Sequence, residues 1–137
     1  MTITAKNANE QLVLDFFKVL SSGDLEALRA FFHDTSVWQP KVKEIAGAGE
    51  HVGMAIIDLF LAPVRGMFEQ GDPKIHVTHL FSDGPTVGVE SYSVGKTMDG
   101  KVYENDYAWV FTVSNGKIDR MHEYMDSHYT AKLFGME

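Results

Sequence analysis

The spacing of apolar residues changes near residue 73. Before that point apolar side chains recur every three or four positions, which is typical of helices packed on one face. After it they alternate with polar side chains, which is typical of strands. Helices followed by a run of hairpin-linked strands predict an α+β fold with an antiparallel sheet packed on three N-terminal helices.

Three helices are expected in the N-terminal half. Asn7 can cap the first helix, with Glu10 as its capping-box partner. Asp24 can cap a second, shorter helix. A third is expected from about Gly53 to Gln70, with a kink or break at Pro63 because proline cannot donate a backbone hydrogen bond.

One short strand and four long strands are expected, and Asn115-Gly116 and Asp99-Gly100 are strong hairpin signals between the long ones. The predicted strands are Thr35–Gln39, Lys74–Ser82, Thr86–Met98 and the two halves of Lys101–Asp126. Strands of ten or more residues favour a sheet that curls and encloses a cavity. The tail, residues 127–137, can either pack on a partner or lie loose.

The last two strands carry polar groups on an otherwise apolar face. Asn105 and Tyr107 share a face with Trp109, and Glu123 lies between Met121 and another methionine. An apolar surface with a few polar groups is typical of a ligand pocket.

Composition narrows the class of protein. The chain has 137 residues, enough for one domain spanning residues 1–137, and a net charge of -7, which disfavours a nucleic-acid partner. There is no cysteine, no apolar run long enough for a membrane span, and no signal-peptide pattern at the N-terminus. A soluble, cytoplasmic protein is therefore expected. Phosphate-binding and dinucleotide-binding glycine motifs are lacking, so no cofactor is expected.

Several motifs in this order resemble the SnoaL-like branch of the nuclear-transport-factor-2-like superfamily. The residues that carry the resemblance are Gly100, Lys101, Tyr103, Asn105, Tyr107, Phe111, Asn115 to Ile118, Glu123, Tyr124 and Asp126, together with a first helix ending in Ser-Gly-Asp and the following LEALRAFF. The resemblance implies a cone-shaped α+β barrel with a pocket between helices and sheet, and a homodimer formed through the outer face of the sheet. Members include polyketide cyclases, ketosteroid isomerases and limonene epoxide hydrolases. The last group carries Arg and Asp where this chain has Ser91 and Ser93, so epoxide hydrolysis is disfavoured.

Glu123 is the first candidate catalytic residue. Burial on an apolar face raises the pKa of a carboxyl group, which suits a general base or acid. The alternative is a structural carboxylate that is hydrogen-bonded to Tyr107 or Asn105. Asp126 is the second candidate catalytic residue, and its alternative is a cap or turn at the end of the strand.

Asn105 and Tyr107 are candidate substrate-binding residues that could donate hydrogen bonds to a carbonyl or enolate oxygen. The alternative is that they satisfy buried polar groups. The remaining substrate-binding candidates are expected in the pocket wall, where plain core packing is the alternative: Trp38, His79, Trp109, Phe60 and Met121. The histidines show no metal-ligand spacing, so no metal site is expected.

The sequence thus favours a cofactor-free isomerase, cyclase or lyase that moves a proton on a small, mostly apolar carbonyl compound. The alternative is a module of the same fold that binds a hydrophobic ligand or only dimerises. The enzyme hypothesis expects a pocket of steroid or terpene size, about 300 Å³ or more, beside Glu123.

Overall fold

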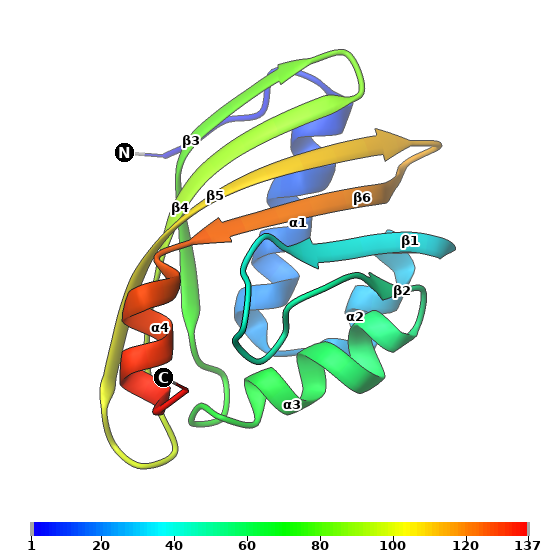
Figure 1. Cartoon of the computed structure of the whole chain (residues 1–137). Coiled ribbons are helices and arrows are strands. Elements are labelled where there is room, and N and C mark those ends of the chain that lie inside the picture. The colour runs from blue at the N-terminus through cyan, green and yellow to red at the C-terminus, as the bar shows by residue number, and fades with distance from the viewer. Residues whose placement is uncertain (1, 137) are drawn as a thin grey trace.

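The computed structural model describes residues 2–136, which form one strongly curved sheet with helices on its inner side (Figure 1). The strands are β1 (Phe32–Pro40), β2 (His51–Val52), β3 (Lys74–Asp83), β4 (Thr86–Lys96), β5 (Val102–Ser114) and β6 (Lys117–Met125), in the order β2-β1-β6-β5-β4-β3. The helices are α1 (Ala8–Ser22), α2 (Leu25–Leu28), α3 (Ala62–Arg65) and α4 (Ser127–Phe134), with a 3-10 turn η1 (Arg29–Phe31) and a π-helical segment η2 (Ile56–Leu61). The predicted α+β fold is confirmed.

The first helix begins and ends where its sequence predicts. The side chain of Asn7 accepts a hydrogen bond of 2.9 Å from the backbone N–H of Glu10, and Gly23 ends the helix with a positive φ of 80°. The apolar stripe of α1 faces the sheet, and Phe16 is fully buried. Its ring makes edge contacts with Phe17, Phe31, Phe32, Trp38 and Phe111. This aromatic cluster joins α1 to the curved sheet.

The third predicted helix is shorter than expected. Helical structure begins at Ile56 in η2 and ends at Arg65 in α3, and mostly turns and bends follow as far as Gly71. The change from π to α geometry falls between Leu61 and Ala62, one residue before Pro63, which has no N–H for an intrahelical bond. Pro63 therefore marks a change of helix type within a continuous segment.

The sheet is mixed because β1 pairs in parallel with β6, whereas all other strand pairs are antiparallel. Hairpins join β3 to β6 in sequence, and hairpins always produce antiparallel neighbours. No hairpin joins β1 to β6, so that pair is free to be parallel. At the last hairpin Asn115 and Gly116 have positive φ values of 51° and 72°, as their turn signal predicts.

A β-bulge in β3 changes which side chains face the core. Val77 is opposite Ser91 and His79 is opposite Glu90, so Thr78 is an extra residue in β3. After the bulge Leu80 packs against the core, while His79 and Phe81 are exposed. The predicted alternation therefore holds only for the first half of this strand.

The C-terminal tail forms the helix α4 against β5 of its own chain, whereas the sequence predicts a tail that packs on a partner or lies loose. Asp126 caps it by accepting a hydrogen bond of 3.0 Å from the N–H of Tyr129, and Gly135 ends it with a φ of 66°. The helix lies beside the curved end of β5 (Figure 1). None of the described helices is long and apolar enough to cross a membrane.

A buried carboxylate ties the start of α1 to β3. Glu10 is 1% exposed and accepts hydrogen bonds from the hydroxyl of Ser82 at 2.5 Å and from the N–H of Lys6 at 3.0 Å. The hydrogen bond from Ser82 is the main cause that lowers the pKa of Glu10, followed by the bond from Lys6. The ionised carboxylate is therefore the form that stabilises this junction.

We expect Glu10→Gln to lower the free energy of unfolding by about 2 kcal/mol at pH 7, because charge-assisted hydrogen bonds are lost. A lowered pKa means that the contribution is complete above the ordinary carboxyl pKa and is lost as the pH falls through the folded-state value. Denaturant unfolding at pH 7 and pH 3 measures the difference, which should shrink at pH 3. Asp15→Asn, at an exposed position of the same helix, is the control and should change little. An equal loss at both pH values would contradict this account.

Candidate functional site

A cavity of about 120 Å³ lies inside the curve of the sheet. Its walls come from α1, from β1 and the loop that follows it, from η2 and α3, from strands β3 to β6, and from α4. Most of the lining side chains are aliphatic or aromatic, and the polar ones are few. Apolar walls with a small number of polar groups are typical of small-molecule sites.

Glu123 is the buried carboxyl group of this cavity. It lies on β6, is 7% exposed, and accepts a hydrogen bond of 2.8 Å from the indole N–H of Trp38 at Oε1. The ion pairs found among residues 2–136 do not include it. Burial raises the pKa of Glu123 to about 7, against the smaller opposing effect of the Trp38 hydrogen bond. The group can therefore gain or lose a proton near neutral pH.

The strand register explains why these two side chains meet. Pro40 on β1 is opposite Glu123 on β6, and Trp38 is two residues earlier on the same face. On the other side of β6, Trp109 of β5 is directly opposite Glu123. The carboxyl group is thus flanked by indole rings on both neighbouring strands, which keep water from it.

Two tyrosines of β5 add hydroxyl groups to the cavity wall. Tyr103 and Tyr107 line the cavity, and their hydroxyls are hydrogen-bonded to each other. Burial is the main cause that raises the pKa of both phenols, and the nearby charge of Glu123 contributes to each. Both groups therefore stay protonated at neutral pH. Their mutual bond uses one of the two protons, which leaves the other to donate elsewhere.

Asn105 supports the tyrosine pair and does not line the cavity. Its Nδ2 atom donates to the hydroxyl of Tyr103 at 3.0 Å and to Oγ1 of Thr130 on α4 at 3.0 Å. Asn105 is 4% exposed and thus satisfies buried polar groups. Its placement matches the alternative interpretation of the sequence, in which Asn105 satisfies buried polar groups.

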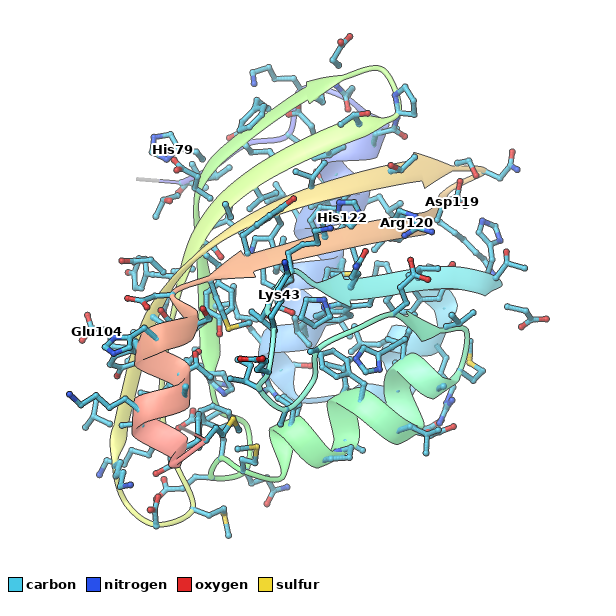
Figure 2. The ribbon with its side chains drawn as sticks, viewed as in Figure 1. Lys43, His79, Glu104, Asp119, Arg120 and His122 are labelled. Carbon is cyan, nitrogen blue, oxygen red and sulfur yellow. The ribbon has the colours of Figure 1, made fainter. Side chains whose placement is uncertain are left out.

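Three further candidate residues lie outside the cavity wall, as Asn105 does. His79 is on the outer side of the sheet, because the bulge at Thr78 reverses its direction, and its ring is paired with Glu90 at 3.0 Å (Figure 2). Asp126 is the exposed cap of α4, where its carboxylate bonds to backbone. Met121 is fully buried in the core and does not line the cavity.

The three expected aromatic wall residues, Trp38, Phe60 and Trp109, all line the cavity. Trp38 packs edge-on against both of the others, with ring centroids 5.4 Å from Phe60 and 5.8 Å from Trp109. The ring of Tyr107 stacks on that of Trp109, with ring centroids 5.4 Å apart and an interplanar angle of 12°. Aromatic rings thus surround the space beside Glu123.

The cavity has a smaller volume than the sequence predicts. Its 120 Å³ falls well below the room that a steroid or terpene needs. The difference has a physical cause, because two segments without a strong sequence pattern fill the cone. The glycine-containing loop after β1 contributes Ile45 and Gly47, and the tail helix contributes Phe134.

Tyr103 is a polar residue of the cavity wall that is not among the residues predicted for the site. It shares the face of Asn105 and Tyr107 in the alternating pattern, so that pattern was a signal for it. The loop and tail residues of the wall had no comparable signal. Among residues 2–136 no three His, Asp or Glu side chains are grouped closely enough to hold a metal ion.

The curved α+β sheet with an inner apolar cavity defines a nuclear-transport-factor-2-like fold. A model of the SnoaL-like domain family matches residues 13–121, so the chain belongs to that family. A comparison with curated proteins finds no significant match.

Solved structures share the fold at low sequence identity. TerC, co-crystallised with polyporic acid, has a TM-score of 0.82 and 21% identity over 94% of this chain and 99% of its own. An NTF2-like protein of unknown function from Burkholderia pseudomallei has a TM-score of 0.82 and 15% identity, covering 93% and 97% of the two chains. A ketosteroid isomerase-like protein from Catenulispora acidiphila, in complex with trimethylamine, has a TM-score of 0.71 and 16% identity, covering 82% and 83%.

Burial of Glu123 predicts a pH dependence of stability. Its raised pKa means that the folded state holds the proton more tightly than the unfolded state does. The free energy of unfolding should therefore fall by up to about 3 kcal/mol as the pH rises from 4.5 to about 7, and then level off. Glu123→Gln should remove this fall, because the amide does not ionise and can still accept from Trp38.

Denaturant unfolding of parent and variant between pH 4 and pH 8 measures this effect. Glu104→Gln is the matched control, because Glu104 is exposed on the outer side of β5 (Figure 2). The control should keep the pH dependence of the parent. Parallel pH curves for the parent and Glu123→Gln would show that Glu123 is not desolvated.

Proposed function

We propose that this protein binds a small, mostly apolar carbonyl compound and catalyses proton transfer on it without a cofactor, as an isomerase, cyclase or lyase. The observation that supports this most directly is the carboxyl group of Glu123, which lines an apolar cavity, has a pKa of about 7 and has no cationic partner among the described side chains. A general base works best when its pKa is near the working pH.

Glu123 takes the proton from the carbon next to the carbonyl group. The carboxylate becomes a neutral acid, and the electron pair of the broken C–H bond moves to the carbonyl oxygen as an enolate. The same carboxyl group returns the proton at another carbon, which completes an isomerisation. Trp38 orients the carboxyl group by its hydrogen bond at Oε1 and leaves Oε2 for the substrate.

Tyr103 and Tyr107 stabilise the negative charge that develops on the substrate oxygen. Tyr107 lies on the strand next to β6, opposite the residue two positions after Glu123, so its hydroxyl and the carboxyl group belong to the same part of the cavity. A protonated donor held in a site of low polarity stabilises an enolate more than it stabilises the ketone. Asn105 holds Tyr103 in place.

The fold neighbours support a small-molecule ligand. One structure contains polyporic acid and another contains trimethylamine. The alternative, a module that binds a ligand without turnover, uses the same cavity and differs only in whether Glu123 exchanges protons with the bound compound.

Hydrogen–deuterium exchange on cyclohex-2-enone, followed by NMR, tests the proposal. The exchange rate should rise about tenfold per pH unit below pH 7 and level off above it, because the ionised form of Glu123 is the base. Glu123→Gln should lower the rate by about 10²- to 10⁴-fold without loss of binding.

Two further variants give this test its controls. Tyr107→Phe keeps the base and removes a donor, so a loss of about 10²-fold is expected. Glu104→Gln should leave the rate unchanged. Equal exchange in the parent and Glu123→Gln would exclude Glu123 from the mechanism, and binding without exchange in the parent would favour the binding module.

We also propose that the protein is a homodimer formed through the outer face of the sheet. Tyr92, Val110 and Tyr124 on the three strands β4 to β6 are 37%, 42% and 42% exposed, which places apolar surface at the centre of that face. Size-exclusion chromatography with light scattering should give a dimer for the parent and a monomer for Val110→Asp. Leu59→Asp, at an exposed position of η2, should remain dimeric. A monomeric parent would disprove the dimer.

A further inference from the structure

The volume of the cavity suits a ligand of one ring. A volume of about 120 Å³ is close to that of apolar cavities of about 150 Å³, which take up benzene. Two fused rings or a steroid nucleus would need more space than the walls leave. The size of the ligand is thus set by the side chains that form the wall beside the carboxyl group.

Phe60 is a wall residue that is held in place by contacts on two sides. Its ring stacks on His51 with centroids 4.1 Å apart and an interplanar angle of 13°. The Nε2 atom of His51 in turn donates a hydrogen bond of 2.8 Å to the carbonyl oxygen of Gly47. A Cβ atom at Gly47 would lie 3.0 Å from Cε1 of Phe60, so the loop backbone lies directly against the ring.

The loop, the imidazole and the phenyl ring therefore brace one another. Phe60 is also in edge contact with Trp38, which holds the carboxyl group of Glu123. This places the ring of Phe60 in contact with both the loop after β1 and the indole that holds the proposed base. Because rigid aromatic walls do not adapt to larger guests, Phe60 is suited to set an upper limit on ligand size.

Two charged side chains, Glu123 and Arg65, line the cavity. Glu123 disfavours an anion when it is ionised. Arg65 is the cation among the residues that line the cavity; its Nη1 atom donates to the carbonyl of Pro73 at 3.1 Å, and its Nη2 atom is buried without a hydrogen-bond partner among residues 2–136. Nη1 is therefore occupied, whereas Nη2 keeps an unused donor.

From these observations we infer that the ligand is a flat, single-ring ketone, and that Phe60, braced by His51 and Gly47, is the residue that excludes larger ring systems. That the ligand is a ketone rests on the proposed function. That it has a single ring rests on the cavity alone. A single ring fits between the aromatic walls with its carbonyl group near Tyr107, and a second fused ring collides with Phe60.

Three ketones of increasing size test the inference: cyclohex-2-enone, 2-tetralone and androst-5-ene-3,17-dione. Both tryptophans of the chain, Trp38 and Trp109, line the cavity, so quenching of intrinsic fluorescence reports binding. The parent should bind the one-ring ketone at least about tenfold more tightly than the two-ring ketone, and the steroid least. Phe60→Ala should bind the two-ring ketone about tenfold or more tightly than the parent does, which removes or reverses the preference for one ring.

Phe60→Leu, a smaller truncation, should shift the preference in the same direction and serves if the alanine variant does not fold. Leu59→Ala changes the exposed neighbour on the same helical segment and should leave all three affinities unchanged. A parent that binds the steroid as tightly as the one-ring ketone, or that binds none of the three, overturns the inference. So does an unchanged size preference in a folded Phe60 variant.

Proton exchange on every ketone that binds is measured separately in the parent and in Glu123→Gln. The size limit can thus fail while Glu123-dependent exchange persists, which would leave the proposed function intact. Exchange can equally be absent while the size limit holds, which would overturn the proposed function alone.

Discussion

The removal of the Glu123 carboxyl group from water is the constraint on which the site depends. A buried carboxylate without a cationic partner is costly, and proteins usually avoid it by protonation or by pairing. Here the carboxyl group has one hydrogen bond, from the indole of Trp38, and a pKa of about 7. The fold tolerates this cost because the surrounding aromatic core is large and is fixed at many points around Phe16.

The curvature of the sheet brings the chemical groups together. Glu123 lies on the last strand, Tyr103 and Tyr107 on the strand before it, and Trp38 on the first strand, which reaches β6 only because β1 and β6 pair in parallel. The parallel pair thus completes the site, since it places an indole donor beside a residue that is 85 positions later in the chain. A purely antiparallel meander of β3 to β6 would leave the carboxyl group without this partner.

The parts of the molecule that sequence predicts well are those with strong periodic patterns. The cap of α1 at Asn7, the hairpin at Asn115 and the inner face of β5 and β6 follow from local rules. The alternating pattern predicts His79 on the inner face of the sheet, but the bulge at Thr78 reverses the direction of every side chain after it. Such a bulge has no sequence signature. The sequence predicts a larger cavity volume than the structure has, because part of the wall comes from a loop and a tail helix whose positions depend on tertiary contacts.

The same rings that raise the pKa of the carboxyl group also restrict the space beside it. Trp38 and Trp109 exclude water from Glu123, and Phe60 closes the wall against Trp38. Widening the cavity by truncating a ring would admit water as well as larger ligands, and water would return the pKa of Glu123 toward its ordinary value. The strength of the base and the size of the ligand are therefore coupled through one set of aromatic contacts.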